Sequence, residues 1–154
     1  MVFEVLTSRP TNTKLKYQDM RATKKKSNRY HLYSLYQRIK NSKDEDGKNV
    51  CCEEWRRNSE SFYIWYENRA KEQKGLCEYC HLPGPTSTHY GGSFRKGKRG
   101  LHLEVDRKDA EGRYSPENCV LACYPCNNAK SDVFSYKEFL DIGKAIGKVK
   151  KRMA

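Results

Sequence analysis

The chain has 154 residues, which is enough for one small domain or for a compact core with an extension. Its apolar fraction of 36% is low and its charged fraction of 32% is high, so the composition excludes a large hydrophobic core. A chain of this kind is expected to need additional stabilisation, for example by a bound metal ion. Lys and Arg number 31 against 19 acidic residues, and a net charge of +12 is typical of a nucleic-acid-binding protein. Residues 14–43 alone hold ten basic side chains against one acid, Asp19.

Signals for export or membrane insertion are not found in the sequence. The N-terminus has no charged leader followed by an apolar run, and no stretch approaches the roughly 20 apolar residues of a membrane helix. We therefore expect a cytoplasmic protein that does not associate with membranes. In that compartment cysteines stay reduced, so paired cysteines are expected to bind metal rather than to form disulfides.

The N-terminal half is predicted to be helical after a weakly ordered segment at residues 1–26. A first amphipathic helix is predicted over 28–41, followed by a turn at 43–49. Its apolar positions are Leu32, Leu35, Tyr36 and Ile39. A second helix is predicted over 61–73, with Gly75 as its stop. Its aromatic face consists of Phe62, Trp65 and Tyr66, which we interpret as core packing rather than as a platform for stacking bases.

Two short strands and a helix are predicted in the second half. Residues 82–100 form a long Gly- and Pro-rich loop, which is typical of a functional or disordered segment. Apolar and polar residues alternate over 101–106, which indicates a strand. After a turn at 110–112, a second strand is predicted at 119–122 and a helix at 124–131.

A final helix is predicted after Ser135, which forms a capping-box pattern with Glu138. Its apolar residues recur at intervals of three and four, which leaves core packing, the favoured reading, and a dimer seam as alternatives. The stripe consists of Phe139, Ile142, Ile146, Val149 and Met153.

Two Cys-x-x-Cys pairs frame this second half, Cys77 with Cys80 and Cys123 with Cys126. Four thiolates in two such pairs suit a tetrahedral zinc ion, and a closed site of this kind is structural rather than catalytic. Redox chemistry at a single pair is the alternative, but no thioredoxin-like βαβ pattern surrounds either pair.

The remaining cysteines have no comparable partners. Cys51 and Cys52 are adjacent, and we interpret them as free or buried thiols rather than as ligands of a second metal site with His31. Cys119 lies in an apolar strand and is expected in the core. His81 follows a cysteine pair and is a zinc ligand only if one cysteine is not.

The segment between the pairs resembles the HNH (ββα-metal, His-Me finger) endonuclease family. Asp106 closes the first strand, Asn118 opens the second, and the helix carries Cys-x-x-Cys-Asn-x-x-Lys up to Lys130. The resemblance covers roughly residues 76–134 and extends to a restriction endonuclease that shares the Asp-Arg pair at 106 and 107. It implies an α+β fold with a small zinc-stabilised ββα-metal core, flanking helices and a basic N-terminal extension.

The resemblance also implies roles for three site residues. Asp106 corresponds to the carboxylate that binds the catalytic metal, and Asn127 takes the second ligand position. Asn118 corresponds to the residue that braces the loop between the strands. Oxygen ligands of this kind suit Mg²⁺ or a similar divalent cation, which would stabilise charge on the leaving oxygen.

The chain departs from the family at position 107. Most members carry a histidine general base there, whereas Arg107 cannot accept a proton at neutral pH and can instead clamp the scissile phosphate. Tyr114 is the best candidate to act as nucleophile, as base or in orienting water; packing in the turn is its alternative. His102, roughly 13 Å from Asp106 along a strand, is a weaker candidate. Glu104 lies nearer on the same strand face, where a carboxylate would tune the metal, and His89 lies in the loop at 82–100, from which it could swing into the site.

These observations predict a DNA endonuclease that cuts double-stranded DNA, of bacterial or phage origin, and a homodimer if it is a restriction enzyme. We expect a helical DNA-binding extension at 1–75, the nuclease core at 76–134 and a C-terminal helix at 135–154. The phosphate-contacting surfaces are expected at 14–43 and 95–99. A non-catalytic zinc-stabilised DNA-binding module is the main alternative. A protein-interaction domain and an RNA substrate are weaker ones.

Overall fold

The computed structural model describes residues 30–84 and 102–152. The chain divides into two compact units, residues 1–35 and 36–154, and the second contains all features discussed below. Residues 30–40 are helical, as predicted for 28–41 as far as the described residues reach. Within the described part of the chain, no helix has the length and apolar character that crossing a membrane requires.

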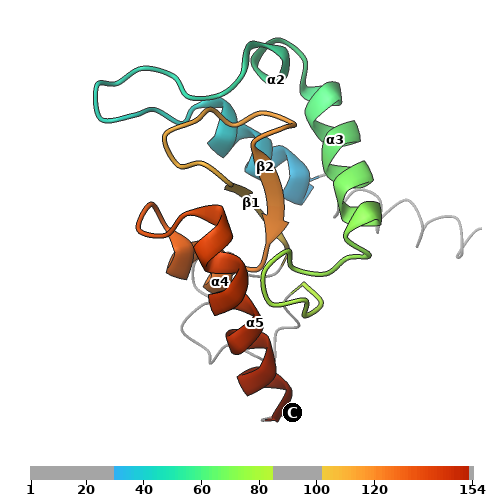
Figure 1. Ribbon diagram of the computed structural model, residues 1–154. Coiled ribbons are helices and arrows are strands. Elements are labelled where there is room, and N and C mark those ends of the chain that lie inside the picture. Colours follow the sequence, from blue (N-terminus) through green and yellow to red (C-terminus); the bar gives the residue numbers. More distant parts are fainter. Residues whose placement is uncertain (1–29, 85–101, 153–154) are drawn as a thin grey trace, which may run out of the picture. The chain divides into compact units, whose positions relative to one another are not determined.

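An antiparallel pair of strands followed by a helix forms the centre of the second unit (Figure 1). Strand β1 spans Glu104–Arg107 and pairs with β2, Cys119–Ala122, so that Glu104 lies opposite Ala122. Helix α4, Tyr124–Lys130, follows β2 after one residue and packs beside β1. This arrangement confirms the predicted α+β class and the order of its elements.

The first predicted strand was placed too early in the sequence. The alternation of apolar residues favoured 101–106, but β1 begins at Glu104 and includes Arg107. The length of β1 is limited by its partner strand, because β2 has only four residues with which β1 can pair. Leu103 precedes the strand and is still buried, and residue 101 lies outside the described part of the chain.

Helix α3, Ser59–Glu72, covers the side of the sheet next to β2. It begins two residues earlier than predicted because Asn58 caps it, accepting a hydrogen bond from the backbone N–H of Glu60 at 3.0 Å. At the other end, the side chain of Gln73 both donates to the carbonyl of Leu121 (2.8 Å) and accepts from its N–H (2.9 Å). One side-chain amide therefore satisfies polar backbone groups at the open edge of β2.

A cluster of aromatic side chains holds α3 to a short preceding helix. Helix α2, Glu53–Arg57, was not predicted, because five residues are too few to show a helical period. Its Trp55 is fully buried and packs on Phe62 at 5.2 Å and on Trp65 at 4.8 Å between ring centroids. The interpretation of the α3 aromatics as core is confirmed for Phe62, which is fully buried.

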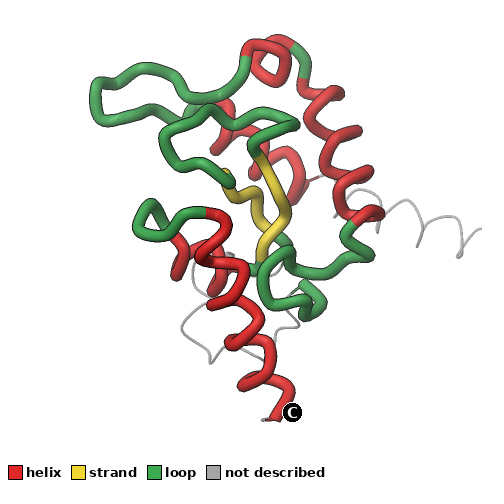
Figure 2. Tube along the Cα trace, in the orientation of Figure 1, coloured by secondary structure: helices red, strands yellow, loops and turns green. Residues whose placement is uncertain are grey.

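Helix α5, Tyr136–Arg152, begins at the predicted capping box. The backbone N–H of Ser135 donates to the Glu138 carboxylate at 2.9 Å. Figure 2 shows this helix running away from the loop that follows α4 to the C-terminal end of the chain.

The buried face of α5 differs from the predicted apolar stripe. Phe139 is fully buried, but Ile142 and Ile146 are only half-buried and Val149 is 54% exposed. The buried line instead continues from Phe139 through Gly143 and Gly147. A methyl group on either glycine would lie within 2.5 Å of Tyr79 or Cys80, so the helix approaches the backbone of the first cysteine pair directly. Met153 lies outside the described residues.

Candidate active site and metal centre

The two cysteine pairs meet in space. Their four sulfur atoms all lie within 4.8 Å of one another, all four residues are buried, and the Sγ atoms of Cys80 and Cys123 are 3.7 Å apart. Hydrogen bonds from Cys123 and Cys126 lower the pKa of the Cys80 and Cys123 thiols respectively, which favours the thiolate form that binds metals. The cluster could hold a metal ion.

The local backbone explains how each pair presents its thiols. Cys77 opens a tight turn in which its N–H donates to the carbonyl of Leu82 (2.9 Å) and its carbonyl accepts from His81 (3.0 Å). Cys123 is the N-cap residue of α4, and Cys126 lies one turn further along the helix. Among the described residues this is the one group of potential metal ligands that contains three or more members, so Cys51, Cys52, His31 and His81 belong to none.

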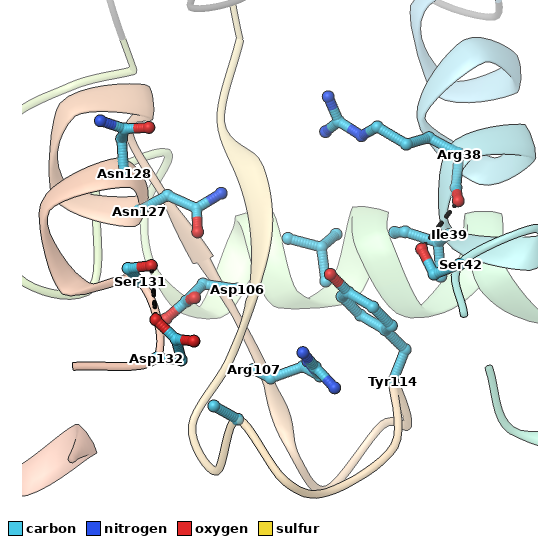
Figure 3. A pocket seen from close by; sticks show the side chains of 12 residues that line it. Arg38, Ile39, Ser42, Asp106, Arg107, Tyr114, Asn127, Asn128, Ser131 and Asp132 are labelled. Carbon is cyan, nitrogen blue, oxygen red and sulfur yellow. Dashed lines mark hydrogen bonds between the residues drawn. The ribbon is translucent and has the colours of Figure 1, made fainter. Parts of the chain in front are cut away.

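A pocket of about 420 Å³ opens where β1, α4 and residues 38–42 meet within the second unit (Figure 3). Figure 3 shows Asp106 and Asn127 on one side of it, with Tyr114 and Arg38 facing them from the other. The pocket contains four of the five predicted catalytic residues. Its lining comprises Arg38, Ile39, Ser42, Val105, Asp106, Arg107, Ala110, Tyr114, Asn127, Asn128, Ser131 and Asp132.

The carboxylate of Asp106 is buried and held through one of its oxygens. Its Oδ2 accepts a hydrogen bond from the Tyr79 hydroxyl at 2.5 Å and lies 3.4 Å from the Nζ of Lys130. Oδ1 takes part in neither contact. Burial raises the pKa of Asp106, and the hydrogen bond from Tyr79 and the positive charge of Lys130 oppose this effect.

Lys130 is itself an unusual residue, because its side chain is only 1% exposed. Its ammonium group donates to the backbone carbonyl of Arg107 at 2.8 Å in addition to its ion pair with Asp106. It therefore ties the last residue of α4 to the end of β1.

The side chain of Asn127 is oriented by Glu104. Its Nδ2 donates to Glu104 Oε2 at 3.0 Å, so the amide oxygen is directed away from that carboxylate. Glu104 is 3% exposed and is also paired with Arg38, whose Nη1 lies 3.7 Å away. Because Glu104 and Asp106 alternate on β1, both face α4, where they meet Asn127 and Lys130.

Arg107 and Tyr114 are stacked in the pocket. The guanidinium carbon lies 4.9 Å from the centre of the tyrosine ring, and Nη1 donates to the carbonyl of Gly112 at 2.9 Å. Burial raises the pKa of Tyr114, and the nearby charge of Arg107 opposes this effect. The phenol therefore stays protonated at neutral pH.

Asn118 lies behind the pocket and fastens the loop between the strands. Its Nδ2 donates to the carbonyls of Asp109 (2.9 Å) and Arg113 (3.0 Å), and its Oδ1 accepts from the N–H of Asp109 (2.9 Å). The side chain thus spans the loop that carries Tyr114 back to β2.

The other predicted candidates do not reach the pocket. His102 is exposed and does not line it, while Glu104 lies behind Asn127. His89, the basic cluster at 95–99 and residues 14–29 lie outside the described part of the chain. Arg38, Lys40 and Lys43 remain from the predicted basic surface, and of these Arg38 lines the pocket.

Sequence reasoning did not single out Tyr79, although its hydroxyl contacts Asp106. Tyr79 lies between two metal-ligand candidates and 27 residues from Asp106, so no local spacing links the two. Arg38 was recognised only as part of a basic segment, because its contact with Glu104 depends on the packing of the helix at 30–40.

Two comparisons with known proteins found a match. Residues 77–132 match the family model "HNH endonuclease". Among solved structures, the chain is similar to the rare-cutting HNH restriction endonuclease PacI, at 29% sequence identity over 56% of this chain and 76% of that one, with a TM-score of 0.40. A comparison with curated proteins found no match. Residues 77–132 therefore match the HNH endonuclease family model, in agreement with the resemblance that the sequence shows.

Proposed function

We propose that the chain is a metal-dependent endonuclease that hydrolyses phosphodiester bonds in double-stranded DNA. The observation that carries this proposal is the pocket in which Asp106 and Asn127, two oxygen donors, face an arginine and a tyrosine inside an HNH domain. The net charge of +12 supports a polyanionic substrate, because neutralising phosphates releases counterions from DNA.

We assign the thiol cluster to a structural zinc ion. Four sulfurs at about 2.3 Å from a tetrahedral zinc lie about 3.8 Å from one another, and the Cys80–Cys123 separation of 3.7 Å fits this value. All four cysteines are buried, so the site leaves no position for water or substrate. Zinc would therefore stabilise the fold rather than take part in hydrolysis.

We assign a second, exchangeable divalent cation, Mg²⁺ or a similar ion, to Asp106 and Asn127. Oδ1 of Asp106, which takes no part in the contacts with Tyr79 and Lys130, and the amide oxygen of Asn127 are hard donors of the kind that Mg²⁺ prefers. Such a cation would stabilise the charge that develops on the leaving oxygen. Two protein ligands leave the other positions to water and to the substrate phosphate.

Arg107 supplies positive charge for the scissile phosphate. Its guanidinium remains charged at any physiological pH, so it stabilises the transition state electrostatically and cannot act as the general base. Its contact with the Gly112 carbonyl and its stacking on Tyr114 keep the group in the pocket before substrate binds.

Tyr114 best fits the role of orienting the attacking water or a phosphate oxygen. Of the three roles considered, nucleophile and base both require a phenolate, which the raised pKa disfavours. A neutral hydroxyl facing Asp106 and Asn127 across the pocket can donate a hydrogen bond without losing its proton.

Cleavage of a supercoiled plasmid tests the proposed function directly. Purified protein with Mg²⁺ should convert the plasmid to nicked and linear forms, and EDTA should stop the reaction until excess Mg²⁺ is restored. Asp106→Ala should abolish cleavage, whereas Asp141→Ala, which removes the same charge from an exposed position on α5, should not. The zinc content of each protein shows whether EDTA or the substitution has disturbed the fold.

An intact plasmid under all metal and salt conditions, together with tight DNA binding, would favour the non-catalytic DNA-binding module instead. Cleavage of RNA but not of DNA would reassign the substrate.

We further propose that the enzyme cuts DNA at specific sequences, as a restriction enzyme does. Sharp fragments from a large DNA would support sequence-specific cutting, whereas a smear would indicate a non-specific phage-type or mobile-element nuclease. A restriction enzyme that cuts a palindrome places one active site on each strand, so we expect a homodimer in that case. Sedimentation of the protein with and without a DNA duplex measures this.

A further inference from the structure

Tyr79 links the metal-binding cysteine turn to the proposed catalytic carboxylate. We propose that Tyr79 is a positioning residue: its hydroxyl holds Oδ2 of Asp106, so that Oδ1 alone is presented to the exchangeable cation. The inference rests on the proposed function, because it concerns the metal ligand of the same site. Residues 77–80 would then both hold zinc and position the carboxylate of Asp106.

The contact between Tyr79 and Asp106 is short, and both residues are buried. The Tyr79 hydroxyl donates to Asp106 Oδ2 at 2.5 Å, and the two residues are 0% and 6% exposed. Hydrogen bonds to an ionised carboxylate are among the stronger ones in proteins, so this contact restrains the rotation of Asp106.

Lys130 completes the restraint on the same oxygen. Its Nζ lies 3.4 Å from Oδ2, and its other contacts are to backbone carbonyls. With Oδ2 engaged by two donors, Asp106 can bind a cation through Oδ1 only. Monodentate binding suits Mg²⁺, which requires near-octahedral geometry, better than it suits Ca²⁺, which accepts bidentate carboxylates.

Tyr79 is fixed by its surroundings on every side that the structure describes. Cys77 and Cys80 flank it in the chain, Gly143 of α5 touches its Cβ and backbone, and the Phe139 ring meets it edge-on at 4.9 Å. The packing of the cysteine turn against α5 therefore holds the Tyr79 hydroxyl close to Asp106. The position of Asp106 thus depends on the state of the thiol cluster, although the two sites share no ligand.

Residues that orient a metal ligand commonly change metal affinity when they are substituted, typically by about 10- to 100-fold. Tyr79→Phe removes only the hydroxyl and keeps the ring contacts with Phe139 and Gly143. We expect this variant to keep one zinc per chain and the wild-type circular dichroism spectrum, while its affinity for a divalent cation at Asp106 falls about 10-fold.

Tyr136→Phe is the matched control. The Tyr136 hydroxyl donates to Glu78 Oε1 at 2.6 Å, so this variant also removes a short hydroxyl–carboxylate bond between an aromatic residue and a carboxylate at the cysteine turn. Tyr136 does not line the pocket. A loss of metal affinity caused by general loosening of the turn would therefore occur in both variants.

Binding of Mn²⁺ to the zinc-loaded full chain without DNA, measured by electron paramagnetic resonance, gives the decisive readout. Asp106→Asn identifies the binding that belongs to this site. Weakened binding in Tyr79→Phe with wild-type binding in Tyr136→Phe is the expected result. The Mg²⁺ concentration for half-maximal cleavage should rise by the same factor, while the rate at saturating Mg²⁺ changes less.

Wild-type Mn²⁺ affinity in Tyr79→Phe, with Asp106→Asn impaired, would overturn the inference and leave the proposed function intact. An equal loss in Tyr79→Phe and Tyr136→Phe would also overturn it, because the effect would then come from the turn as a whole. Identical Mn²⁺ binding by wild type and Asp106→Asn would instead remove the proposed metal site, and the inference with it.

Discussion

Arg107 defines the chemistry of the pocket at the scale of single residues. At position 107, where the resemblance to HNH endonucleases leads to the expectation of a histidine base, a guanidinium is stacked on Tyr114 at 4.9 Å. The two residues form a donor surface that faces Asp106 and Asn127. Such a surface binds and polarises a phosphate, but it contains no group that takes a proton at neutral pH. In the proposed function, water activation then depends on the metal site and on orientation by Tyr114.

Removal of the Tyr114 hydroxyl tests whether this group orients the attacking water. Tyr114→Phe should lower the cleavage rate by on the order of 10- to 100-fold, because one preorganised donor to the reacting groups is lost. DNA affinity should stay close to wild type, since the ring still supports Arg107. Single-turnover cleavage together with a binding titration separates the two effects, and near-normal cleavage would remove Tyr114 from the mechanism.

The pH profile distinguishes a phenol from a phenolate at the same position. Burial raises the pKa of Tyr114 above its ordinary value of 10.0, so the neutral form persists throughout the range from pH 7 to 9. If the neutral hydroxyl acts, the wild-type to Tyr114→Phe rate ratio is flat over this range. If the phenolate acts, the ratio rises about tenfold for each pH unit.

At the scale of elements, α5 serves as a backing for the cysteine turn. Gly143 and Gly147 lie one helical turn apart, and their missing side chains let the helix contact the backbone of Tyr79 and Cys80. Glycine normally weakens a helix, so its use at both positions indicates that the close approach is worth more than the helix propensity. The predicted apolar stripe of α5 therefore lies beside this contact and not within it.

Gly143→Ala should therefore destabilise the protein despite the better helix propensity of alanine. The added Cβ would lie 2.5 Å from the Tyr79 Cβ and 2.7 Å from its carbonyl carbon, and such overpacking costs about 1–3 kcal/mol. Chemical denaturation of the zinc-loaded protein measures the loss.

Ala145→Gly, at an exposed position on the same helix, provides the comparison. It should cost about 1 kcal/mol through helix propensity alone. A stabilising Gly143→Ala variant would show that α5 does not press on the cysteine turn.

At the scale of the whole molecule, the thiol cluster connects segments that are distant in the sequence. It joins the turn after α3 to the start of α4. The small core of the described residues includes an aromatic cluster and a two-stranded sheet. A small core of this kind supplies little stability by itself. If the cluster binds zinc as proposed, the free energy of metal binding is therefore expected to be a large part of the free energy of folding.

Thiol labelling at pH 8 before and after chelation tests this dependence. In the metal-loaded protein, burial raises the pKa of Cys51 to about 11 and of Cys119 to about 12, so only about 0.1% or less of either is thiolate. Half-buried Cys52 should react first and slowly. A strong zinc chelator should make all seven cysteines reactive and reduce the helical circular dichroism signal. Four newly reactive thiols with unchanged helix content would show that the fold does not need the metal.

The sequence by itself determined the features that depend on local chemistry and spacing. The paired cysteines, the capping box at Ser135 and the order of strand, strand and helix follow from short patterns whose physical meaning does not depend on the rest of the chain. The set of Asp106, Asn118 and Asn127 follows from the resemblance to the HNH family, and the structure brings Asp106 and Asn127 together in one pocket.

Only the tertiary structure decided which side chains meet across long stretches of chain. The Tyr79 hydroxyl reaches Asp106, Arg38 reaches Glu104 and Gly143 reaches the backbone of Tyr79, over sequence separations that no periodicity describes. These contacts arise because the sheet, α5 and the metal-binding turn pack against one another, and packing selects partners by shape and charge rather than by spacing.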